Sequence, residues 1–315
     1  MKCVVTGAAG FIGSHLCEHL LAQGHTVTGI DAFIPYYPRF FKENHLCSLR
    51  GKPGFTFHEV DLRFHDLNKL LAGAEWVFHL AAVPGLSRSW TEFDLYQSCN
   101  LTATQRLLDA CRRVPLRRFV QISTSSVYGR FACGDETLPL NPISPYGVTK
   151  LAAENLARAY ADEGDLPLVV VRYFSVYGPR QRPDMAYHRF IHAMLHDQPV
   201  SITGDGLQVR GNTFVSDCVM ATLAAAEAPV GEIFNVGGGE SASVLDIIAR
   251  LESIIGVKAR RVFEPARPGD QRVTGADTRR LQRLTGWKPQ VSLEQGLAQQ
   301  VAWQRTLGHH IQVAA

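Results

Sequence analysis

The chain has 315 residues, which is enough for one large domain or for a large domain with a smaller one attached. With 46% apolar and 19% charged residues it has an ordinary globular composition, and its net charge of +3 is too small to indicate a nucleic-acid or membrane partner. No apolar run reaches the roughly 18 residues of a membrane-spanning helix, and the first residues lack a signal-peptide pattern. The seven cysteines contain no CxxC pair and the twelve histidines form no ligand motif, so we expect a cytoplasmic protein with reduced thiols and no metal site.

Short β-branched segments alternate with longer amphipathic segments in the first half of the chain. Strands are expected at Lys2–Thr6, Thr26–Ile30, Phe55–Val60, Trp76–Leu80, Phe119–Ile122 and Leu168–Arg172, and helices at Phe11–Gln23, Phe93–Arg113 and Tyr146–Asp162. This alternation predicts a parallel sheet that helices cover on both faces. Ligands of such sheets bind beyond the carboxyl ends of the strands.

The regular alternation ends after about Pro179. Short strands are then expected at Val200–Thr203, Ile233–Val236 and Arg261–Phe263, between helices at Pro183–Leu195, Ser243–Ile255 and Leu293–Thr306. We interpret this half as a smaller lobe that packs over the sheet edge and forms the second wall of a cleft.

A glycine-rich turn follows the first predicted strand and opens the first predicted helix. Gly7 permits the tight turn, Gly10 lets the backbone approach a pyrophosphate, and Gly13 allows helix and strand to pack closely. Asp31 ends the second strand, where a carboxylate accepts hydrogen bonds from both hydroxyls of an adenine ribose and repels a 2′-phosphate. The expected cofactor is therefore NAD and not NADP, and the alternative is a purely structural glycine turn with an acidic cap.

Two further strand ends face the same predicted cleft. Asp61-Leu62 lies where the adenine would rest, and Leu80-Ala81-Ala82 places small residues beside the phosphates. Taken alone, each segment is equally well explained as core or turn.

A tyrosine and a lysine four residues apart begin the third predicted helix. This spacing places Tyr146 and Lys150 on one helical face, where a lysine cation lowers the pKa of a phenol from its usual ~10. Tyr146 is then able to take a proton from a sugar hydroxyl while the adjacent carbon gives its hydride to NAD, and Lys150 is able to hold the nicotinamide ribose. Tyr/Lys pairs with this spacing also occur on ordinary helix surfaces.

Four hydroxyl groups, Ser123-Thr124-Ser125-Ser126, follow the fifth predicted strand directly. At the carboxyl end of a parallel strand they face the same crevice as Tyr146, and one of them is placed to share the proton of the reacting hydroxyl. A turn in which these hydroxyls satisfy their own backbone explains one or two of them, but less naturally all four.

Together these motifs resemble the extended short-chain dehydrogenase/reductase family, and within it the nucleotide-sugar epimerases and dehydratases. The resemblance runs from residue 1 to about residue 305. It rests on the glycine triplet, Asp31, His79-Leu80-Ala81-Ala82, Ser123-Thr124-Ser125-Ser126-Val127-Tyr128-Gly129 and Tyr146-x-x-x-Lys150.

The resemblance implies a Rossmann-type, doubly wound parallel sheet with a smaller C-terminal α/β lobe for the substrate. Residues 1–178 would form the NAD-binding domain, with part of the chain returning to it near 212–240, and residues 179–315 mainly the nucleotide-sugar-binding lobe. The family also implies tightly held NAD, a UDP-sugar substrate and a homodimer built on the Phe93–Arg113 and Tyr146–Asp162 helices.

Carried over residue by residue, the resemblance makes Thr124 the catalytic hydroxyl, Tyr146 the base and Lys150 its modulator. The implied cofactor contacts are Gly7, Gly10, Phe11, Ile12, Gly13, Asp31, Lys42, Asp61, Leu62, Leu80, Ala81, Ala82, Asn100, Tyr146, Lys150 and Tyr173. The implied substrate contacts are Pro84, Gly85, Arg88, Thr124, Ser125, Ser126, Ser175, Arg182, Arg210, Arg267 and Asp270.

The second half supplies the anion site in this comparison. Arg210 and Arg267 suit a diphosphate because their planar donors bind oxygens in pairs, and Asp270 would accept from ribose hydroxyls. The segment 201–203 would face the uracil. Gly211-Asn212 departs from the family, whose members usually carry an acid and an aromatic residue there.

Among the branches of the family, the chain is most similar to the UDP-glucuronate 4-epimerases. Three stretches carry this similarity: residues 31–42 with the Tyr36-Tyr37 pair, Pro84-Gly85, and Arg180–Ala186. Oxidation of C4 in glucuronate creates a β-keto acid, which loses carbon dioxide when its carboxylate bond aligns with the carbonyl π system. The hydroxyls of residues 124–126 and Ser175 are expected to prevent that alignment, with Arg182 steering the ligand. The branch usually carries an arginine where this chain has Ser87, and whether the neighbouring Arg88 replaces it stays open.

Other activities of the family remain as alternatives. Dehydratases and decarboxylases commonly carry glutamate at position 126, whereas Ser126 cannot transfer that proton near neutral pH, which favours epimerisation. A 4-epimerase of UDP-glucose is the nearest rival. A regulator that senses NAD without chemistry is disfavoured, because such proteins typically lose the Tyr/Lys pair.

Overall fold

A parallel seven-stranded sheet forms the centre of the molecule in the computed structural model, which describes residues 1–164, 166–266 and 269–307. Its strands are β1 (Lys2–Thr6), β2 (Thr26–Asp31), β3 (Phe55–Glu59), β4 (Trp76–His79), β5 (Arg118–Thr124), β7 (Leu168–Tyr173) and β11 (Ile233–Val236). Their spatial order is β11-β7-β5-β4-β1-β2-β3, and every neighbouring pair is parallel. The order reverses between β1 and β4, so a crevice for a ligand opens there, beyond the carboxyl ends of the strands. The expectation of a doubly wound parallel sheet is confirmed.

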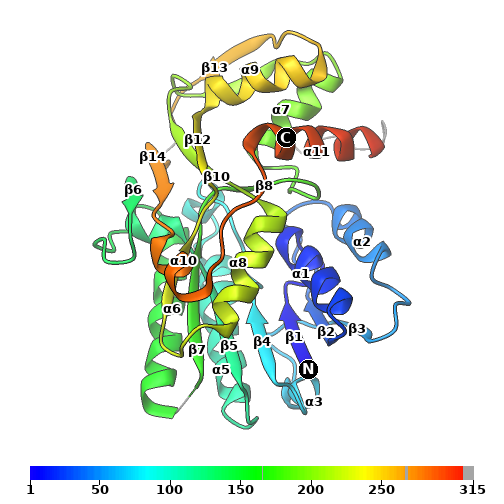
Figure 1. Cartoon of the computed structure of the whole chain (residues 1–315), viewed down its shortest axis with the longest axis vertical. Helices are drawn as coiled ribbons and strands as arrows, with labels where there is room; N and C mark the ends of the chain where they lie inside the picture. Colours follow the sequence, from blue (N-terminus) through cyan, green and yellow to red (C-terminus); the bar gives the residue numbers. More distant parts are fainter. Residues whose placement is uncertain (165, 267–268, 308–315) are drawn as a thin grey trace.

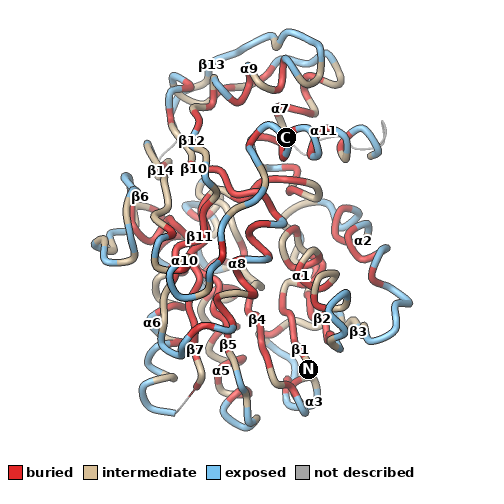
Figure 2. Tube along the Cα trace, in the orientation of Figure 1, coloured by how far each residue is buried: buried red, intermediate tan, exposed pale blue. Residues whose placement is uncertain are grey.

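Helices cover both faces of this sheet (Figure 1). On one face α1 (Phe11–Ala22) contacts α8 (Val215–Glu227), and on the other α5 (Ala103–Cys111) contacts α6 (Pro145–Gly164). Because neighbouring residues of a strand point to opposite faces, Val5 packs in the core beneath α1, whereas Val4 packs beneath α5. Figure 2 accordingly shows the strands mostly buried and the loops exposed.

Three smaller helices lie at the rim of the sheet. They are α2 (Arg39–Cys47), which contacts α1, α3 (Asn68–Leu71), which contacts α5, and α10 (Arg279–Thr285), which contacts α8. No helix in the described part of the chain is both long and apolar enough to cross a membrane.

A smaller lobe lies beyond the carboxyl ends of the strands, at the top of Figure 1. One of its sheets has the order β12-β10-β14-β6 with β8 paired to β10, and the other pairs β13 with β9. Its elements are β6 (Phe131–Gly134), β8 (Val176–Tyr177), β9 (Val200–Thr203), β10 (Val209–Phe214), β12 (Glu240–Ser243), β13 (Arg261–Glu264), β14 (Val273–Ala276), α7 (Ala186–Leu195), α9 (Val244–Ile255) and α11 (Leu293–Thr306). α7 begins later than the expected Pro183, so Arg182 lies in a loop.

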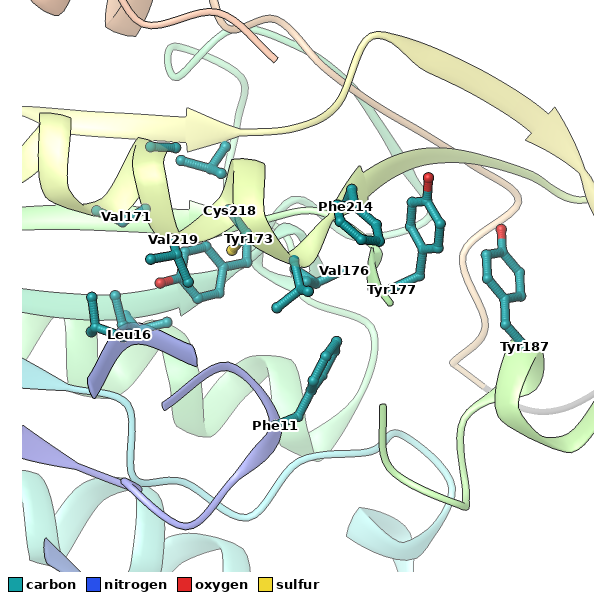
Figure 3. Packing of buried hydrophobic residues seen from close by; sticks show 14 of the residues in the cluster. Phe11, Leu16, Val171, Tyr173, Val176, Tyr177, Tyr187, Phe214, Cys218 and Val219 are labelled. Atoms are coloured by element: carbon teal, nitrogen blue, oxygen red, sulfur yellow. The ribbon is translucent and has the colours of Figure 1, made fainter. Parts of the chain in front are cut away.

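One apolar core joins the two lobes. Figure 3 shows Phe11, in the first turn of α1, pointing toward Val176 of β8, and both side chains belong to the same buried cluster. The division near residue 178 stays a prediction, because β6 lies before that residue and β11 after it, each in a sheet formed mainly by the other part of the chain.

The structure corrects the helix expected over Phe93–Arg113. This segment consists of α4 (Phe93–Gln97), a π-helical turn (Ser98–Thr102) and α5. The π-helical turn contains Asn100, whose side chain bonds the main-chain N–H and C=O of Val83 at 2.7 and 3.0 Å. The amphipathic period is continuous through this turn, so the sequence pattern does not reveal it.

A buried ion pair joins α6 to β7. The Arg172 guanidinium donates twice to the Glu154 carboxylate, with Nε 3.1 Å from Oε2, and the two side chains are 2% and 0% exposed. Arg172 also donates to the Tyr128 hydroxyl at 2.7 Å, and that hydroxyl donates to Asn235 of β11. Removing one partner of such a pair leaves an uncompensated buried charge.

Arg172→Met should lower the free energy of unfolding by about 3–5 kcal/mol, because the buried Glu154 carboxylate would lose both hydrogen bonds from the guanidinium. Chemical denaturation followed by circular dichroism measures this loss. Arg117→Met is the control, since Arg117 is 67% exposed in its pair with Glu75 and its removal should have little effect. Equal losses in the two variants would show that burial of the Arg172 pair does not matter.

Candidate active site

A cleft of about 340 Å³ opens at the carboxyl ends of β1, β2, β4, β5 and β7. The sequence-derived candidates that line it are Gly7, Gly10, Phe11, Ile12, Gly13, Asp31, Lys42, Asp61, Leu62, Leu80, Ala81, Ala82, Pro84, Thr124, Tyr146, Lys150, Tyr173, Ser175 and Arg182. The structure therefore brings the glycine turn, the acidic strand end and the Tyr/Lys pair to one place, although they are distant in the sequence.

The glycine turn is packed too closely for side chains. Gly7 has a φ of +74°, and a Cβ at this position would lie 2.9 Å from the Ala81 nitrogen. A Cβ on Gly13 would lie 2.2 Å from the Gly7 carbonyl oxygen. Gly10 caps α1 without a side chain, so the first N–H groups of the helix stay available at the cleft. This cradle fits a pyrophosphate, whose charge a helix N-terminus stabilises.

Two ion pairs form the wall beside the cradle. Asp31 Oδ1 accepts from the Phe33 N–H and from Lys42 Nζ, both at 2.8 Å, and the two partners Asp31 and Lys42 are 6% and 9% exposed. Asp61 pairs with Arg63 at 2.7 Å. Lys42 thus neutralises the charge of Asp31. The strand-end motif alone does not reveal this ion pair.

The catalytic candidates meet from two elements. Tyr146 and Lys150 lie near the start of α6, and Thr124 ends β5. The side chains of Thr124 and Tyr146 line the same cleft, and Thr124 Oγ1 donates to Ser126 Oγ at 3.3 Å. Lys150 Nζ donates to the Ile122 carbonyl oxygen at 2.6 Å, which holds the lysine against β5.

Desolvation dominates the pKa values of the Tyr/Lys pair. It raises the pKa of the Tyr146 phenol, although the Thr124 hydroxyl and the charge of Arg182 act in the opposite direction. Burial lowers the pKa of Lys150 to about 8, while the Glu154 carboxylate opposes that shift. The expectation that the phenol has a lowered pKa is therefore wrong for the protein without ligand. Loss of water around the ring outweighs the nearby positive charge.

The hydroxyl-rich segment after β5 is in part a self-satisfied turn. Thr124 Oγ1 accepts from the Ser126 N–H at 3.2 Å and caps a 3-10 turn, Ser125–Tyr128. The Ser125 hydroxyl donates to Gln271 at 3.2 Å. Within the described ranges, Thr124 lines the cleft but Ser125 and Ser126 do not, so their substrate contacts stay predictions.

Arg182 reaches the cleft from the loop between β8 and α7. Its guanidinium donates to both oxygens of Asp184, at 2.9 and 2.8 Å, and its Cζ lies 5.7 Å from the centre of the Tyr36 ring. Burial lowers the pKa of Arg182, but the Asp184 charge outweighs burial, so the pKa is raised and the side chain stays a cation.

The cleft wall also contains Ser123, one of the four hydroxyls expected to face it, and further residues to which sequence analysis assigns no contact, among them Tyr36, Tyr37, Arg63 and Met185. A signal exists for most of them. Tyr36, Tyr37 and Met185 belong to stretches that resemble the 4-epimerase branch, and Arg63 follows shortly after Asp61.

Other candidates are absent from the cleft wall as far as the chain is described: Gly85, Arg88, Asn100, Arg210 and Asp270. Arg88 donates to Glu92 and to the Tyr36 carbonyl oxygen. Asn100 uses its amide on Val83 and, at 3.1 Å, on Thr149 of α6. The ligand contacts proposed for these residues stay predictions.

The predicted anion site is only partly described. Arg210 pairs with Asp270 at 2.8 Å, and Arg267 lies outside the described residues. The departure at Gly211 has a local reason, because a Cβ there would lie 3.1 Å from the Gly275 Cα, and glycine lets β10 approach β14.

No group of three or more His, Cys, Asp or Glu side chains among the described residues is placed to hold a metal ion. The cysteines are free thiols, and burial raises the pKa of Cys17, Cys111 and Cys218, which keeps these thiols protonated.

The sheet, the glycine cradle and the cleft at the switch point define a Rossmann-type dinucleotide-binding protein. The model of the NAD dependent epimerase/dehydratase family matches residues 3–237. The chain belongs to this family.

Known relatives match nearly the whole chain. It is 46% identical over 312 residues to YtcB of Bacillus subtilis, named an uncharacterized UDP-glucose epimerase, with 98% of this chain and 99% of YtcB covered. It is 38% identical over 309 residues to a UDP-glucuronate 4-epimerase of Thermodesulfobacterium geofontis, with 96% and 95% covered. The crystal structure of the Bacillus cereus UDP-glucuronic acid 4-epimerase with UDP-glucuronic acid and NAD is similar with a TM-score of 0.95 and 46% identity, over 98% of this chain and 100% of that one.

Lys150→Met should stabilise the nucleotide-free protein at pH 7 by on the order of 1–3 kcal/mol. The variant removes a buried cation, which is favourable, but it also loses the hydrogen bond to the Ile122 carbonyl oxygen, which is unfavourable. The pKa of Lys150 is about 8 in the folded protein, against 10.5 for an ordinary lysine. The unfolded chain thus binds the proton of Lys150 more tightly than the folded protein does. Burying this lysine therefore costs the most stability below pH 8, and the cost decreases as the pH rises to 10.5.

Thermal unfolding of both proteins at pH 7 and pH 10 measures this effect. The advantage of the methionine variant should shrink at pH 10. A stability difference that does not change with pH would contradict the lowered pKa of Lys150.

Proposed function

We propose that the protein is an NAD-dependent 4-epimerase that converts UDP-glucuronate to UDP-galacturonate through a transient 4-keto sugar. The observation that carries this proposal is the meeting of Tyr146, Thr124 and the Arg182 cation in the wall of one cleft, beside a cradle for a diphosphate. The similar Bacillus cereus enzyme, which acts on UDP-glucuronic acid by its name, supports the choice of sugar.

NAD would lie along the carboxyl ends of β1, β2 and β4. The amides at the start of α1 would hold its diphosphate, Asp31 its adenine-ribose hydroxyls and Lys150 its nicotinamide ribose. When bound, NAD accepts the C4 hydride of the sugar and later returns it.

Tyr146 would move the proton of the reacting hydroxyl. Its oxygen would take the proton from the C4 hydroxyl as the hydride leaves C4, and the Thr124 hydroxyl in the same cleft wall would share this proton. The 4-keto sugar then turns about its link to the diphosphate while the nucleotide stays anchored. After the hydride returns to the opposite face, Tyr146 gives the proton to the new C4 hydroxyl. Because desolvation raises the phenol pKa, an opposing positive charge is needed to make this oxygen a base, and Arg182 supplies one.

Arg182 would hold the sugar carboxylate. The 4-keto intermediate is a β-keto acid and keeps its carboxylate only while that group stays out of line with the carbonyl π system. Arg182 is fixed by Asp184, and the hydroxyls of Thr124 and Ser175 line the same cleft, so they offer donors for a carboxylate. Ser126, in place of an acidic residue, leaves no group there for the proton transfer of a dehydratase.

A UDP-glucose 4-epimerase is the second candidate, because the similar YtcB carries that name. Arg182 favours the glucuronate, since a neutral hydroxymethyl group at C5 does not need a cation beside it.

The nucleotide end of the substrate would bind in the smaller lobe. Arg210 and Asp270, which pair with each other, lie there, and Arg267 would add a second cation. We therefore place the boundary between the cofactor domain and the nucleotide-sugar lobe near residue 178, with residues 212–240 returning to the cofactor domain.

We also propose that the protein is a cytoplasmic homodimer. Trp90, Phe93 and Val148 are 53%, 46% and 47% exposed, and they lie on η1 (Arg88–Trp90), α4 and α6, which contact one another. Together they offer an apolar centre for an interface. The free thiols support a reducing compartment.

The double variant Phe93→Glu, Val148→Glu should be a monomer in sedimentation velocity, because two charges cannot be buried unpaired at the centre of an interface. Val230→Glu is the control, since Val230 is 57% exposed and lies outside these elements. A double variant with the mass of the wild type would place the interface elsewhere.

Tyr146→Phe should reduce epimerisation by about 10²–10⁴-fold and leave the bound NAD in place, because only the phenolic oxygen is lost. Purified protein is incubated with UDP-glucuronate, and in parallel with UDP-glucose, without added cofactor, and the products are read by NMR. Tyr160→Phe, near the end of the same helix and outside the cleft wall, should keep full activity. Near-normal turnover by Tyr146→Phe would remove the proposed base, and faster turnover of UDP-glucose by the wild type would overturn the choice of sugar.

A further inference from the structure

The loop between β8 and α7, residues 178–185, holds Arg182 in the cleft without being helix or strand. Contacts with α1, on the cofactor side of the cleft, hold the first part of this loop. Arg180, with a φ of +68°, donates to Glu18 of α1 at 2.7 Å, and His15 of α1 bonds the Pro179 carbonyl oxygen at 3.0 Å. A loop of this kind needs fixed contacts to keep one side chain in one direction.

Gln300 of α11 anchors the same loop from the opposite side. Its Oε1 accepts the Gly178 N–H at 2.9 Å, and its Nε2 donates to Gln181 Oε1 at 2.8 Å. Gln181 in turn accepts from the His188 N–H at 3.0 Å and donates to the Val176 carbonyl oxygen at 3.2 Å. The amide of Gln300 thus ties both ends of the sequence Gly178–Gln181, and Arg182 is the next residue.

This network is completely enclosed. Gln300, Gln181 and His188 are 0%, 2% and 1% exposed. Along α11 the neighbouring buried positions hold Leu297 and Val301, so an apolar residue at position 300 would suit the helix equally well. A buried amide is favourable only when its hydrogen bonds are satisfied, and Gln300 satisfies both through the loop.

We propose that Gln300 is a positioning residue for Arg182, although it belongs to a helix outside the cleft wall. Gln300 holds Gly178 and Gln181 in place and so fixes the main-chain position of the next residue, Arg182. Asp184 holds the guanidinium of Arg182 from the other side. The C-terminal helix therefore contributes to the recognition of the sugar carboxylate. This inference depends on the proposed role of Arg182 in binding that carboxylate.

The experiment compares Gln300→Met, which keeps the length of the side chain and removes both hydrogen bonds, with Gln304→Met. Gln304 is the matched control, because it lies one turn further along α11, is also buried, and reaches this network only through the His188 carbonyl oxygen, with no hydrogen bond to residues 178–185. Calorimetry gives the dissociation constants of UDP-glucuronate and UDP-glucose for each NAD-loaded protein, and each variant is also made in an Arg182→Ala background.

Gln300→Met should raise the dissociation constant of UDP-glucuronate about five-fold, which corresponds to the loss of one or two hydrogen bonds. It should raise the dissociation constant of UDP-glucose less than two-fold. Gln304→Met should change neither constant. In the Arg182→Ala background Gln300→Met should cause no further loss, because the residue through which it acts is absent. Gln300→Asn, which shortens the side chain but keeps the amide, should show a smaller loss of the same kind and replaces Gln300→Met if that variant does not fold.

Three results for Gln300→Met would overturn the inference: an unchanged dissociation constant for UDP-glucuronate, an equal loss of affinity for both nucleotide sugars, or an equal loss of affinity with and without Arg182. The Arg182→Ala protein separates this failure from a failure of the proposed function. If Arg182→Ala binds UDP-glucuronate normally, the carboxylate role itself is wrong. If it binds weakly while Gln300→Met binds normally, the role stands and the positioning does not.

Discussion

Lys150 keeps an ammonium group inside the protein, where Nζ donates to the Ile122 carbonyl oxygen and burial lowers its pKa to about 8. A cation in this position needs compensating charge, and Glu154, one turn further along α6, supplies it. Glu154 is completely buried and is held in turn by Arg172 of β7. The register between α6 and β7 is therefore fixed by electrostatics as well as by packing, and the position of Tyr146 on the same helix follows from it.

The two ligands of the proposed reaction meet at this helix from opposite sides. In this proposal the glycine cradle, with Gly7 close to Ala81, would hold the cofactor on the β1 side, and the loop around Arg182 would hold the sugar on the side of the smaller lobe. Burial raises the pKa of Tyr146, and the charge of Arg182 opposes this rise, so the cation proposed to bind the carboxylate also favours the ionised phenol. Binding and proton transfer are thus linked through one guanidinium.

The sequence predicts those parts of this arrangement that depend on local chain requirements. β-branched runs identify the strands, and the glycine triplet identifies the cradle, because no other residue fits where a Cβ would lie 2.2 Å from a carbonyl oxygen, as at Gly13. Contacts between distant segments are not predictable in this way. The Lys42 partner of Asp31 and the π-helical turn at Asn100 depend on neighbours that only the fold brings close. The raised pKa of Tyr146 has the same origin, since desolvation is a property of the assembled cleft.

Part of the smaller lobe comes before the last strand of the central sheet in the sequence. β10 precedes both α8, which packs against α1, and β11, which closes the sheet beside β7. Figure 3 shows Cys218 and Val219 of α8 near Val171 of the sheet, and these side chains share one buried cluster. A polypeptide ending at residue 178 would lack the outer strand β11 and would cover that face of the sheet with α1 alone, without α8. The nucleotide-binding half is consequently not a detachable module, and an autonomous fragment or a fusion partner would have to carry the sequence through β11.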